Sequence, residues 1–169
     1  MEAIILAGGE GIRLRPLTHN LPKPMLPVLN RPFVEHTTAY LQKNQIGNIV
    51  LATSYLSEAI QEYFGQGASQ DVKLSYALED KPLGTAGAVK NTEHHLSDAF
   101  FVLNGDIFTD LDLASMLAFH REKGAKVTIA LTWVDNPCAY GVVESEGDGR
   151  ITCFIEKPSH NYITTNWIN

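Results

Sequence analysis

The chain has 169 residues, of which 44% are hydrophobic and 19% are charged, and its formal net charge is −6 at pH 7. This apolar content excludes a disordered tail and suits a single domain of ordinary size. The acidic balance argues against nucleic acid as a partner, because phosphate backbones attract basic surfaces. The first apolar run, residues 3–7, is far too short to cross a membrane, and two cysteines are too few for a disulfide framework. We therefore expect a cytoplasmic protein with no membrane partner.

Apolar runs rich in β-branched residues alternate with helical patterns through most of the chain. Such runs predict strands, and apolar residues three or four positions apart predict helices. This alternation predicts an α/β fold, in which a mostly parallel sheet carries helices on both faces. The expected elements in chain order are strand 3–7, helix 32–45, strand 48–53, helix 56–64, strand 72–77, helix 85–95, strand 99–103, helix 111–123 and strand 126–134.

Beyond residue 134 the pattern becomes that of a hairpin. Residues 141–146 and 150–156 predict two strands, and the Gly-Asp-Gly segment at 147–149 predicts the turn between them. At the start of the preceding helix, Asp110 or Asp112 can cap the backbone, and Gly124 suits its end. We find no internal repeat along the chain.

Three glycines, Gly8, Gly9 and Gly11, follow the first expected strand directly. Glycines at the carboxyl end of a buried strand let backbone N–H groups approach a ligand, and successive inward N–H groups form an anion-binding nest. Ligands of open α/β sheets bind at this edge. The dinucleotide fingerprint is excluded because Leu14 occupies its third glycine position, and no Gly-Lys-Ser/Thr follows as a P-loop requires. The glycines alone are also compatible with a simple turn.

Positive charge gathers around these glycines. Residues 8–31 contain four basic side chains and one acid, so this stretch carries +3 and the rest of the chain −9. Such a cationic island suggests a compact anion, for example a triphosphate, although a basic solvated loop is equally compatible with the charge alone. Arg13 can fork onto phosphate oxygens, and Lys23 offers a point charge held stiffly between two prolines. The prolines on both sides favour a lysine held in a fixed position over a lysine on a solvated surface.

Short segments of distinctive composition extend from this loop to the last expected strand of the hairpin. They are GGEGIRLRPLT at residues 8–18, KPMLP at 23–27, PLGTAGA at 82–88, LNGD at 103–106, YGVVE at 140–144 and FIEKP at 154–158. In this order they resemble the sugar-phosphate nucleotidylyltransferases, also called nucleotide-sugar pyrophosphorylases. The segments at 82–88 and 104–113 most resemble the mannose-1-phosphate guanylyltransferases. The resemblance implies a Rossmann-like fold of the nucleotide-diphospho-sugar transferase type, and one difference is Ile12, where the family usually has threonine or serine.

The resemblance implies an enzyme that transfers a nucleotidyl group from a nucleoside triphosphate to a sugar 1-phosphate and releases pyrophosphate. Such an in-line attack needs positioning, charge neutralisation and a divalent metal rather than a covalent nucleophile. In this role Arg13 stabilises the triphosphate, Lys23 contacts the reacting phosphates, and Asp106, expected at the end of a buried strand, binds Mg²⁺. The residues implied for nucleotide binding are Leu6, Ala7, Gly8, Gly9, Gly11, Glu79, Gly84 and Thr85.

Glu79 stands where the family places the side chain that reads the base. Relatives that use thymidine or uridine triphosphates resemble one another in having a glutamine there. A carboxylate accepts two hydrogen bonds and so matches the N1–H and N2–H₂ donors of guanine, whereas it faces the oxygens of uracil poorly. Glu79 therefore favours GTP, with mannose 1-phosphate as the second substrate. The alternative is a solvated loop charge beside Asp80 and Lys81.

For the sugar, the resemblance implies that Gly141 permits close approach of the substrate, Glu156 accepts from hydroxyl groups and Lys157 pairs with the phosphate. A simple ion pair at the end of a strand is the alternative for the last two residues. The family's catalytic domain is longer and supplies a second metal-binding aspartate beyond the FIEKP segment. We therefore expect one catalytic domain over residues 1–169, incomplete at its C-terminus, that binds nucleotide but turns over poorly.

The sequence is compatible with other functions and with self-association. Apolar surface and an unpaired sheet edge left by an incomplete domain favour self-association, so a homo-oligomer is possible. Within the enzyme class, the substrates could be glucose 1-phosphate with UTP or dTTP. A non-catalytic homologue that senses a nucleotide sugar is disfavoured by Arg13, Lys23 and Asp106, since a sensor needs no charged leaving-group site. A glycosyltransferase is disfavoured because its Asp-x-Asp motif, spelled by residues 110–112, falls at the start of a helix.

Overall fold

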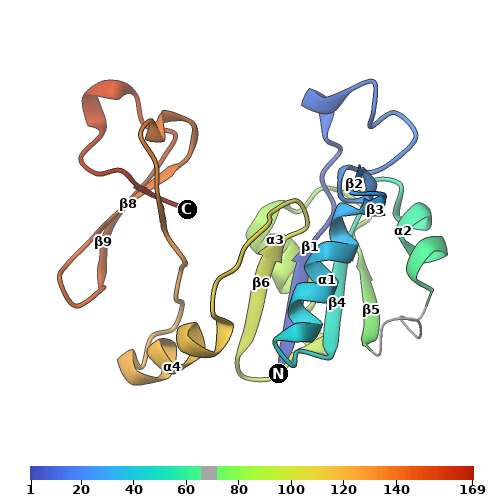
Figure 1. The fold of residues 1–169 in the computed structure, drawn as a ribbon, viewed down its shortest axis with the longest axis horizontal. Coiled ribbons are helices and arrows are strands. Elements are labelled where there is room, and N and C mark those ends of the chain that lie inside the picture. Colours follow the sequence, from blue (N-terminus) through green and yellow to red (C-terminus); the bar gives the residue numbers. More distant parts are fainter. Residues whose placement is uncertain (66–71) are drawn as a thin grey trace. The chain divides into compact units, whose positions relative to one another are not determined.

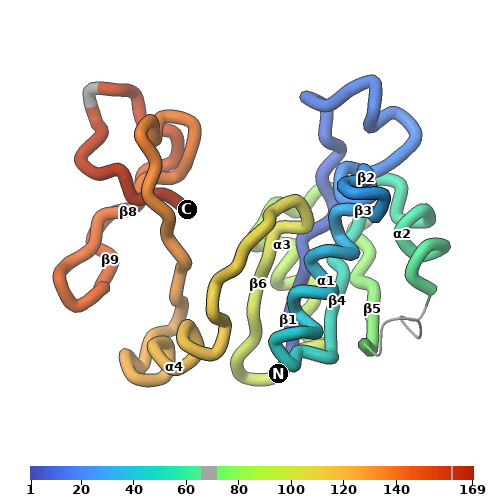
Figure 2. The backbone as a smooth tube through the Cα atoms, in the orientation of Figure 1, coloured from blue at the N-terminus to red at the C-terminus, as the bar shows by residue number. Residues whose placement is uncertain are grey.

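The computed structural model describes residues 1–65 and 72–169; Figure 1 shows the elements and Figure 2 the backbone trace. The chain forms two compact units, Met1–Asp110 and Leu111–Asn169, and each is described by itself. Among the described residues, no helix combines the length and the apolar character needed to cross a membrane.

The first unit is built on a sheet of four parallel strands (Figure 1). Buried neighbours on both sides of the central strands explain their almost continuous apolar sequences, since polar side chains would find no water there. Residues 3–5 and 49–52 are accordingly almost fully buried. This parallel sheet confirms the predicted fold class. Its members, in the spatial order β5-β4-β1-β6, are β5 (Lys73–Leu78), β4 (Asn48–Thr53), β1 (Glu2–Leu6) and β6 (Phe100–Asn104).

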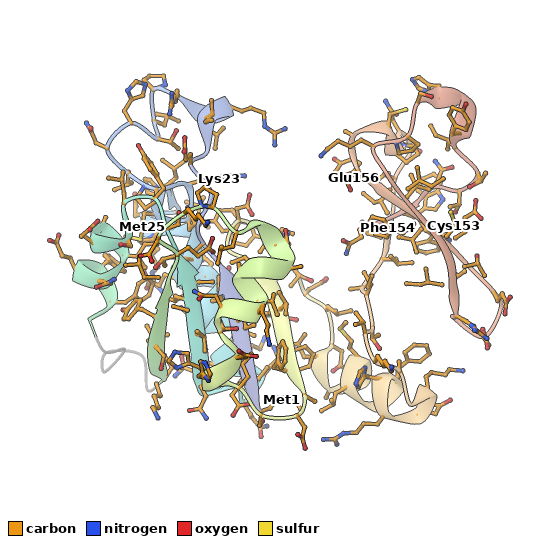
Figure 3. All side chains as sticks on the ribbon, turned by 180° about the vertical axis from the view of Figure 1, so that it is seen from behind. Met1, Lys23, Met25, Cys153, Phe154 and Glu156 are labelled. Atoms are coloured by element: carbon orange, nitrogen blue, oxygen red, sulfur yellow. The ribbon has the colours of Figure 1, made fainter. Side chains whose placement is uncertain are left out.

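Helices cover both faces of this sheet, as the sequence predicts. The helix α1 (Phe33–Lys43) lies in front of the strands in Figure 1. The helix α3 (Gly84–Asn91) lies in front of them in Figure 3, which views the molecule from behind. Ala88 of α3 packs with Ile4 and Ala52 of the sheet, so small and branched side chains close this face.

The helices that flank the strands are shorter than the sequence predicts. The helix α2 begins one residue later than expected and spans Ser57–Phe64. The helix α3 stops at Asn91, and a separate 3-10 turn, Glu93–His95, follows it. Apolar periodicity does not mark helix ends, which depend on the local turns and caps.

The segment between β1 and α1 is irregular, and it carries the glycine-rich loop. It contains two 3-10 turns, Ile12–Leu14 and Lys23–Met25. A small hairpin of β2 (Pro27–Val28) and β3 (Arg31–Pro32) then leads into α1. Met25 is only 6% exposed, so the segment is anchored to the core at its second turn.

The second unit joins one helix to an antiparallel sheet of four short strands. The turn between its two longest strands is made by Gly149, which has a φ of 88° that suits glycine. This is the hairpin that the sequence predicts at residues 147–149. The elements are α4 (Leu113–Lys123), β7 (Thr132–Trp133), β8 (Gly141–Ser145), β9 (Ile151–Glu156) and β10 (Trp167–Ile168), and the spatial order of the strands is β7-β10-β8-β9.

Asp112, one of the two predicted N-cap residues, and Gly124, the predicted C-cap, cap the two ends of α4. The Asp112 carboxylate accepts the backbone N–H groups of Ala114 at 2.9 Å and Ser115 at 3.0 Å, and the Ser115 hydroxyl donates to it at 2.7 Å. These hydrogen bonds, with the Ser115 hydroxyl first, hold the pKa of Asp112 below its usual value. Gly124 ends the helix in the left-handed conformation, with a φ of 57°.

Two predictions about strands are wrong. Residues 126–134 form a strand only at Thr132–Trp133, where β10 pairs with them. An apolar run becomes a strand only where a neighbour takes up its backbone hydrogen bonds. The strand before Asp106 is not buried: β6 lies at the edge of the first sheet, and its Val102 is 43% exposed. Strand order decides which strand becomes an edge, and a single sequence does not reveal that order.

Candidate functional site

The candidate site lies at the carboxyl ends of the parallel strands in the first unit. Leu6 of β1 is level with Ala52 of β4 and with Asn104 of β6, so these side chains emerge on one face of the sheet. A cavity of about 920 Å³ lies there, which is large enough for a nucleotide-sized ligand. The predicted site residues that line it are Leu6, Gly8, Gly9, Gly11, Arg13, Lys23, Glu79, Gly84, Thr85 and Asp106.

Ala7 is a predicted nucleotide-binding residue that does not line this cavity. It follows Leu6 directly, so its side chain points to the opposite face, where it is 1% exposed. Its backbone N–H donates to the Ala52 carbonyl at 2.8 Å. Ala7 therefore holds β1 against β4 and presents no side chain to a ligand in the cavity.

The glycine-rich loop presents backbone donors to the cavity. Within the part of the chain that the structure describes, no hydrogen bond takes up the N–H groups of residues 8–11. Gly11 has a φ of 62°, and a Cβ there would lie 2.9 Å from the Cβ of Lys23, so the turn requires glycine. Consecutive unpaired N–H groups beside a left-handed residue form a concavity that suits phosphate oxygens.

Lys23 and Asp106 form an ion pair at one wall of the cavity. Figure 3 shows Lys23 between the loop and the ends of the strands, and two buried prolines flank it. Asp106 follows β6, where the Gly105 N–H donates to the Leu6 carbonyl at 2.9 Å and so docks this turn on β1. The two side chains are 35% and 31% exposed, so both are positioned by the fold and still open to a ligand.

Glu79 is oriented by the chain around it. Its backbone N–H donates to the Thr53 carbonyl at 2.9 Å, which extends the pairing of β5 with β4. Its Oε2 accepts the backbone N–H of Leu83 at 3.0 Å, directly before α3. Its Oε1 faces the loop, because a Cβ on Gly8 would lie 3.5 Å from it. The carboxylate is thus held in the cavity wall with one oxygen turned toward the glycines.

The carboxylate of Asp106 lines the cavity together with those of Glu10 and Glu79, and it is the one that follows a strand of the sheet directly beside Lys23. Among the described residues, no group of three His, Cys, Asp or Glu side chains could hold an ion by itself. Mg²⁺ is usually bound by one or two carboxylates together with substrate phosphates. The Asp106 carboxylate therefore fits a magnesium ion whose other ligands would come from the phosphates of a ligand.

The three residues predicted for the sugar belong to the hairpin of the second unit. Gly141 of β8 is level with Glu156 of β9, and Glu156 pairs with Lys157 at 2.7 Å. Both charged side chains are exposed. A Cβ on Gly141 would lie 2.6 Å from the ring of Phe154, so the glycine makes room for an aromatic neighbour within this unit. The ion pair leaves both charged groups open to a ligand.

Several residues that line the cavity were not among the predicted site residues. Ala52 and Ala88 form part of the wall, and their small side chains leave space beside the loop. Asn104 joins them from the edge strand. The position of Ala52 and Asn104 near the ends of strands was a signal, because the last residues of neighbouring parallel strands meet at one edge of the sheet. This signal can be used only if the register between the strands is known. The register pairs Leu6 with Ala52 and with Asn104, and local sequence does not specify it.

The chain matches the family model described as nucleotidyl transferase over residues 2–169. The chain belongs to the nucleotidyl transferase family. The match spans both units and includes every predicted site residue, in the cavity and in the hairpin.

Relatives in this family match nearly the whole chain. The chain is 39% identical over 158 residues to the mannose-1-phosphate guanylyltransferase of Mycobacterium tuberculosis, and 44% identical over 163 residues to the mannose-1-phosphate guanylyltransferase catalytic subunit beta of Danio rerio. It is 38% identical over 183 residues to the UTP–glucose-1-phosphate uridylyltransferase of Synechocystis. These matches cover 93%, 94% and 100% of this chain, and 44%, 45% and 47% of the relatives. The chain therefore spans less than half of their length.

Solved structures share the fold. A Bacillus anthracis protein assigned as a glucose-1-phosphate thymidylyltransferase, in complex with sucrose, matches with a TM-score of 0.85 at 29% identity, over 99% of this chain and 68% of that one. HddC from Yersinia pseudotuberculosis, in complex with GMP-PN, matches with a TM-score of 0.76 at 27% identity, over 99% and 72% of the two chains. These neighbours confirm the predicted nucleotide-diphospho-sugar transferase fold.

Proposed function

We propose that the whole protein transfers a guanylyl group from GTP to mannose 1-phosphate, giving GDP-mannose and pyrophosphate. The observation that carries this proposal is one cavity that gathers the unpaired N–H groups of residues 8–11 with Arg13, Lys23 and Asp106. A triphosphate concentrates negative charge, and these groups supply donors, cations and a metal ligand for it. Two of the relatives are themselves mannose-1-phosphate guanylyltransferases, which supports the choice of substrates.

In this reaction a phosphate oxygen of the sugar 1-phosphate attacks the α-phosphorus of the nucleotide. The bond from that phosphorus to the oxygen bridging to the β-phosphate breaks, and pyrophosphate leaves with both electrons of that bond. The loop N–H groups hold phosphate oxygens, and the Arg13 guanidinium forks onto the triphosphate and the departing pyrophosphate. The Lys23 ammonium neutralises charge where the bond forms and breaks.

Asp106 is the residue that would hold a magnesium ion. A bound magnesium ion would supply charge neutralisation on the phosphates. The position of Asp106 is fixed by the turn after β6, which the hydrogen bond from Gly105 to Leu6 docks on β1. Its present partner, Lys23, can turn to the phosphates because both side chains are partly exposed.

Glu79 supports guanine as the base. Its carboxylate lies in the cavity wall, and the Leu83 N–H orients one of its oxygens. Each carboxylate oxygen has two lone pairs, so Oε1 and the remaining lone pair of Oε2 can accept from N1–H and N2–H₂ of guanine. Uracil presents one donor, N3–H, between the acceptors O2 and O4 at the corresponding edge, so a carboxylate could accept only one hydrogen bond there and would face oxygens beside it.

For the sugar substrate we propose Glu156 and Lys157, with Gly141 beside them. An exposed carboxylate next to an exposed ammonium suits hydroxyl groups and a phosphate, respectively. A uridylyltransferase acting on glucose 1-phosphate is the second candidate function. It is favoured by the Synechocystis relative, whose 38% identity is close to that of the guanylyltransferases.

The nucleotide preference of the chain tests the proposal. We expect titration calorimetry with GTP, UTP, dTTP, CTP and ATP, each with Mg²⁺, to show GTP binding about tenfold tighter than UTP, since mismatched polar groups cost at least about 1.4 kcal/mol. Tighter binding of UTP or dTTP would replace the proposal by the second candidate. Binding of no nucleotide at all would contradict both functions.

The Glu79→Gln variant isolates the role of the carboxylate. Its amide oxygen can still accept the Leu83 N–H, so the turn before α3 is preserved. We expect its affinity for GTP to fall about tenfold while its affinity for UTP does not fall. Unchanged affinity for GTP would contradict the base-reading role. Pyrophosphate release by the chain from GTP with mannose 1-phosphate, compared with UTP and glucose 1-phosphate, then tests the sugar.

A further inference from the structure

Two hydroxyl groups that take no part in the proposed reaction hold the glycine-rich loop and the turn after it through hydrogen bonds. Thr18 is fully buried, with 0% exposure, and its Oγ1 donates to the Gly11 carbonyl at 2.9 Å. The same carbonyl accepts the backbone N–H of Leu14 at 2.8 Å. Two donors on one carbonyl fix the direction of its peptide plane, and with it the N–H of Ile12 on the other side of that plane.

The methyl branch of Thr18 packs against the same glycine. A Cβ on Gly11 would lie 3.0 Å from the Thr18 Cγ2 and 2.9 Å from the Lys23 Cβ, so the glycine is enclosed between these two side chains. Lys23 in turn pairs with Asp106 after β6. Thr18 therefore links the backbone donors of the loop to the charged pair at the cavity wall.

Tyr55 connects the same turn to the end of β4 through hydrogen bonds. It follows β4 and is half-buried, and its hydroxyl donates toward the carbonyls of Thr18 at 3.3 Å and His19 at 3.1 Å. The loop is thus held from β4 through Tyr55 and from β6 through the pair of Lys23 with Asp106. Neither Thr18 nor Tyr55 lines the cavity, so any effect on a ligand must pass through the loop.

We infer that Thr18 and Tyr55 are positioning residues that hold the glycine-rich loop in place for phosphate before a ligand arrives, the N–H of Ile12 directly and the N–H groups of residues 8–11 through the enclosed Gly11. A loop that must be ordered on binding loses affinity to the conformational entropy of ordering, and a fastened loop avoids this loss. The inference rests on the proposed function, because it takes the ligand of the cavity to be a nucleoside triphosphate.

Three variants of the chain separate positioning from folding. Thr18→Val keeps the side-chain shape and removes the hydroxyl, Thr18→Ser keeps the hydroxyl, and Tyr55→Phe removes one phenolic oxygen. Each variant is titrated with GTP and with guanosine in the presence of Mg²⁺, and its unfolding midpoint in urea is measured. Guanosine is the matched probe, because it carries the same base and no phosphate.

We expect Thr18→Val to weaken GTP binding about tenfold and to leave guanosine binding within about twofold. Thr18→Ser is expected to restore the affinity for GTP, and Tyr55→Phe to weaken it about threefold, since the Tyr55 hydroxyl contacts are longer. Equal losses for GTP and guanosine, or a lower urea midpoint with unchanged GTP affinity, would overturn the inference in favour of a purely structural role. If Thr18→Val does not fold, the test is whether Tyr55→Phe weakens the binding of GTP more than the binding of guanosine, and equal losses would overturn the inference.

The outcome also separates this inference from the proposed function. An unaltered chain that binds GTP, together with Thr18 and Tyr55 variants that bind it equally well, overturns only the positioning role. An unaltered chain that binds neither GTP nor guanosine contradicts the proposed function and the inference together.

Discussion

The two units of the chain differ in how completely they bury their apolar side chains. In the first unit, β1 and β4 have neighbours on both sides, and Ile4, Ile5 and Leu51 are fully buried. Among the described residues of the second unit, the buried hydrophobic side chains are Leu113, Val142, Val143 and Ile168. Its large aromatic side chains are instead exposed, for example Trp133, Phe154 and Trp167 at 56%, 46% and 49%.

The groups of the proposed reaction are divided between these two units. The donors and cations for phosphate are mounted on a continuous parallel core, whose strand ends collect them at one edge. The residues proposed for the sugar are mounted on an antiparallel sheet of short strands with few buried side chains. Because stability rises with buried apolar area, we expect the first unit to be the more stable of the two.

The largest expected effect on this comparison comes from the core of the first unit. Leu51→Ala removes a fully buried side chain of β4 and should lower that unit's free energy of unfolding by about 3 kcal/mol, through lost burial and the cavity left behind. Urea unfolding followed by the helical circular dichroism signal measures this, since α1, α2 and α3 belong to the first unit and supply most of the helical signal, while α4 of the second unit supplies the smaller part.

Val143→Ala in β8 is the matched change in the second unit. It should cost that unit about 2 kcal/mol, since it removes two methyl groups from a side chain that is 1% exposed. Tryptophan fluorescence reports on this unit alone, because both tryptophans of the chain, Trp133 and Trp167, lie in it. If either variant shifted both signals equally, the two units would unfold as one and the comparison would fail.

A bound nucleotide should sharpen the difference between the units. GTP at 100 times its dissociation constant should raise the free energy of unfolding of the first unit by about 2.7 kcal/mol. The tryptophan transition of the second unit should stay where it is, because every residue that lines the cavity belongs to the first unit. An equal shift of the tryptophan transition would contradict separate unfolding, and guanosine at the same concentration serves as a weak-binding control.

The smallest expected effect concerns the cap of α4 in the second unit. The pKa of Asp112 is lowered in the folded state by the hydrogen bonds from Ser115 and Ala114. These contacts therefore stabilise the fold above the unfolded pKa of about 3.9, and their contribution is lost as the pH falls through the folded pKa. Asp112→Ala should lower the tryptophan-detected midpoint at neutral pH, and by less in acid. A loss of the same size at both pH values would contradict a role for the charged carboxylate.

Local patterns in the sequence were strong predictors where an element is defined by its own residues. The predicted strand 48–53 coincides with β4, and the predicted strand 3–7 is displaced from β1 by one residue. Gly124 was recognisable as a cap, and Asp112 as one of two candidates with Asp110, because a capping side chain or a left-handed glycine acts on the nearest turn. The prediction of a strand over residues 126–134 was wrong, because apolar residues predict a strand but do not supply the neighbouring strand that it needs.

Much of the composition of the cavity also followed from the sequence: ten of the eighteen described residues that line it were predicted site residues, and others, such as Ala88 and Asn104, lie within the quoted motifs. Their arrangement came from contacts that no local pattern contains. Lys23 meets Asp106 across 83 positions of sequence, and the register of β1 with β4 and β6 brings Ala52 and Asn104 level with Leu6 at the cavity. Backbone hydrogen bonding and apolar periodicity act between near neighbours, whereas strand order and register depend on the packing of distant side chains. Tertiary packing therefore decided which residues share the cavity.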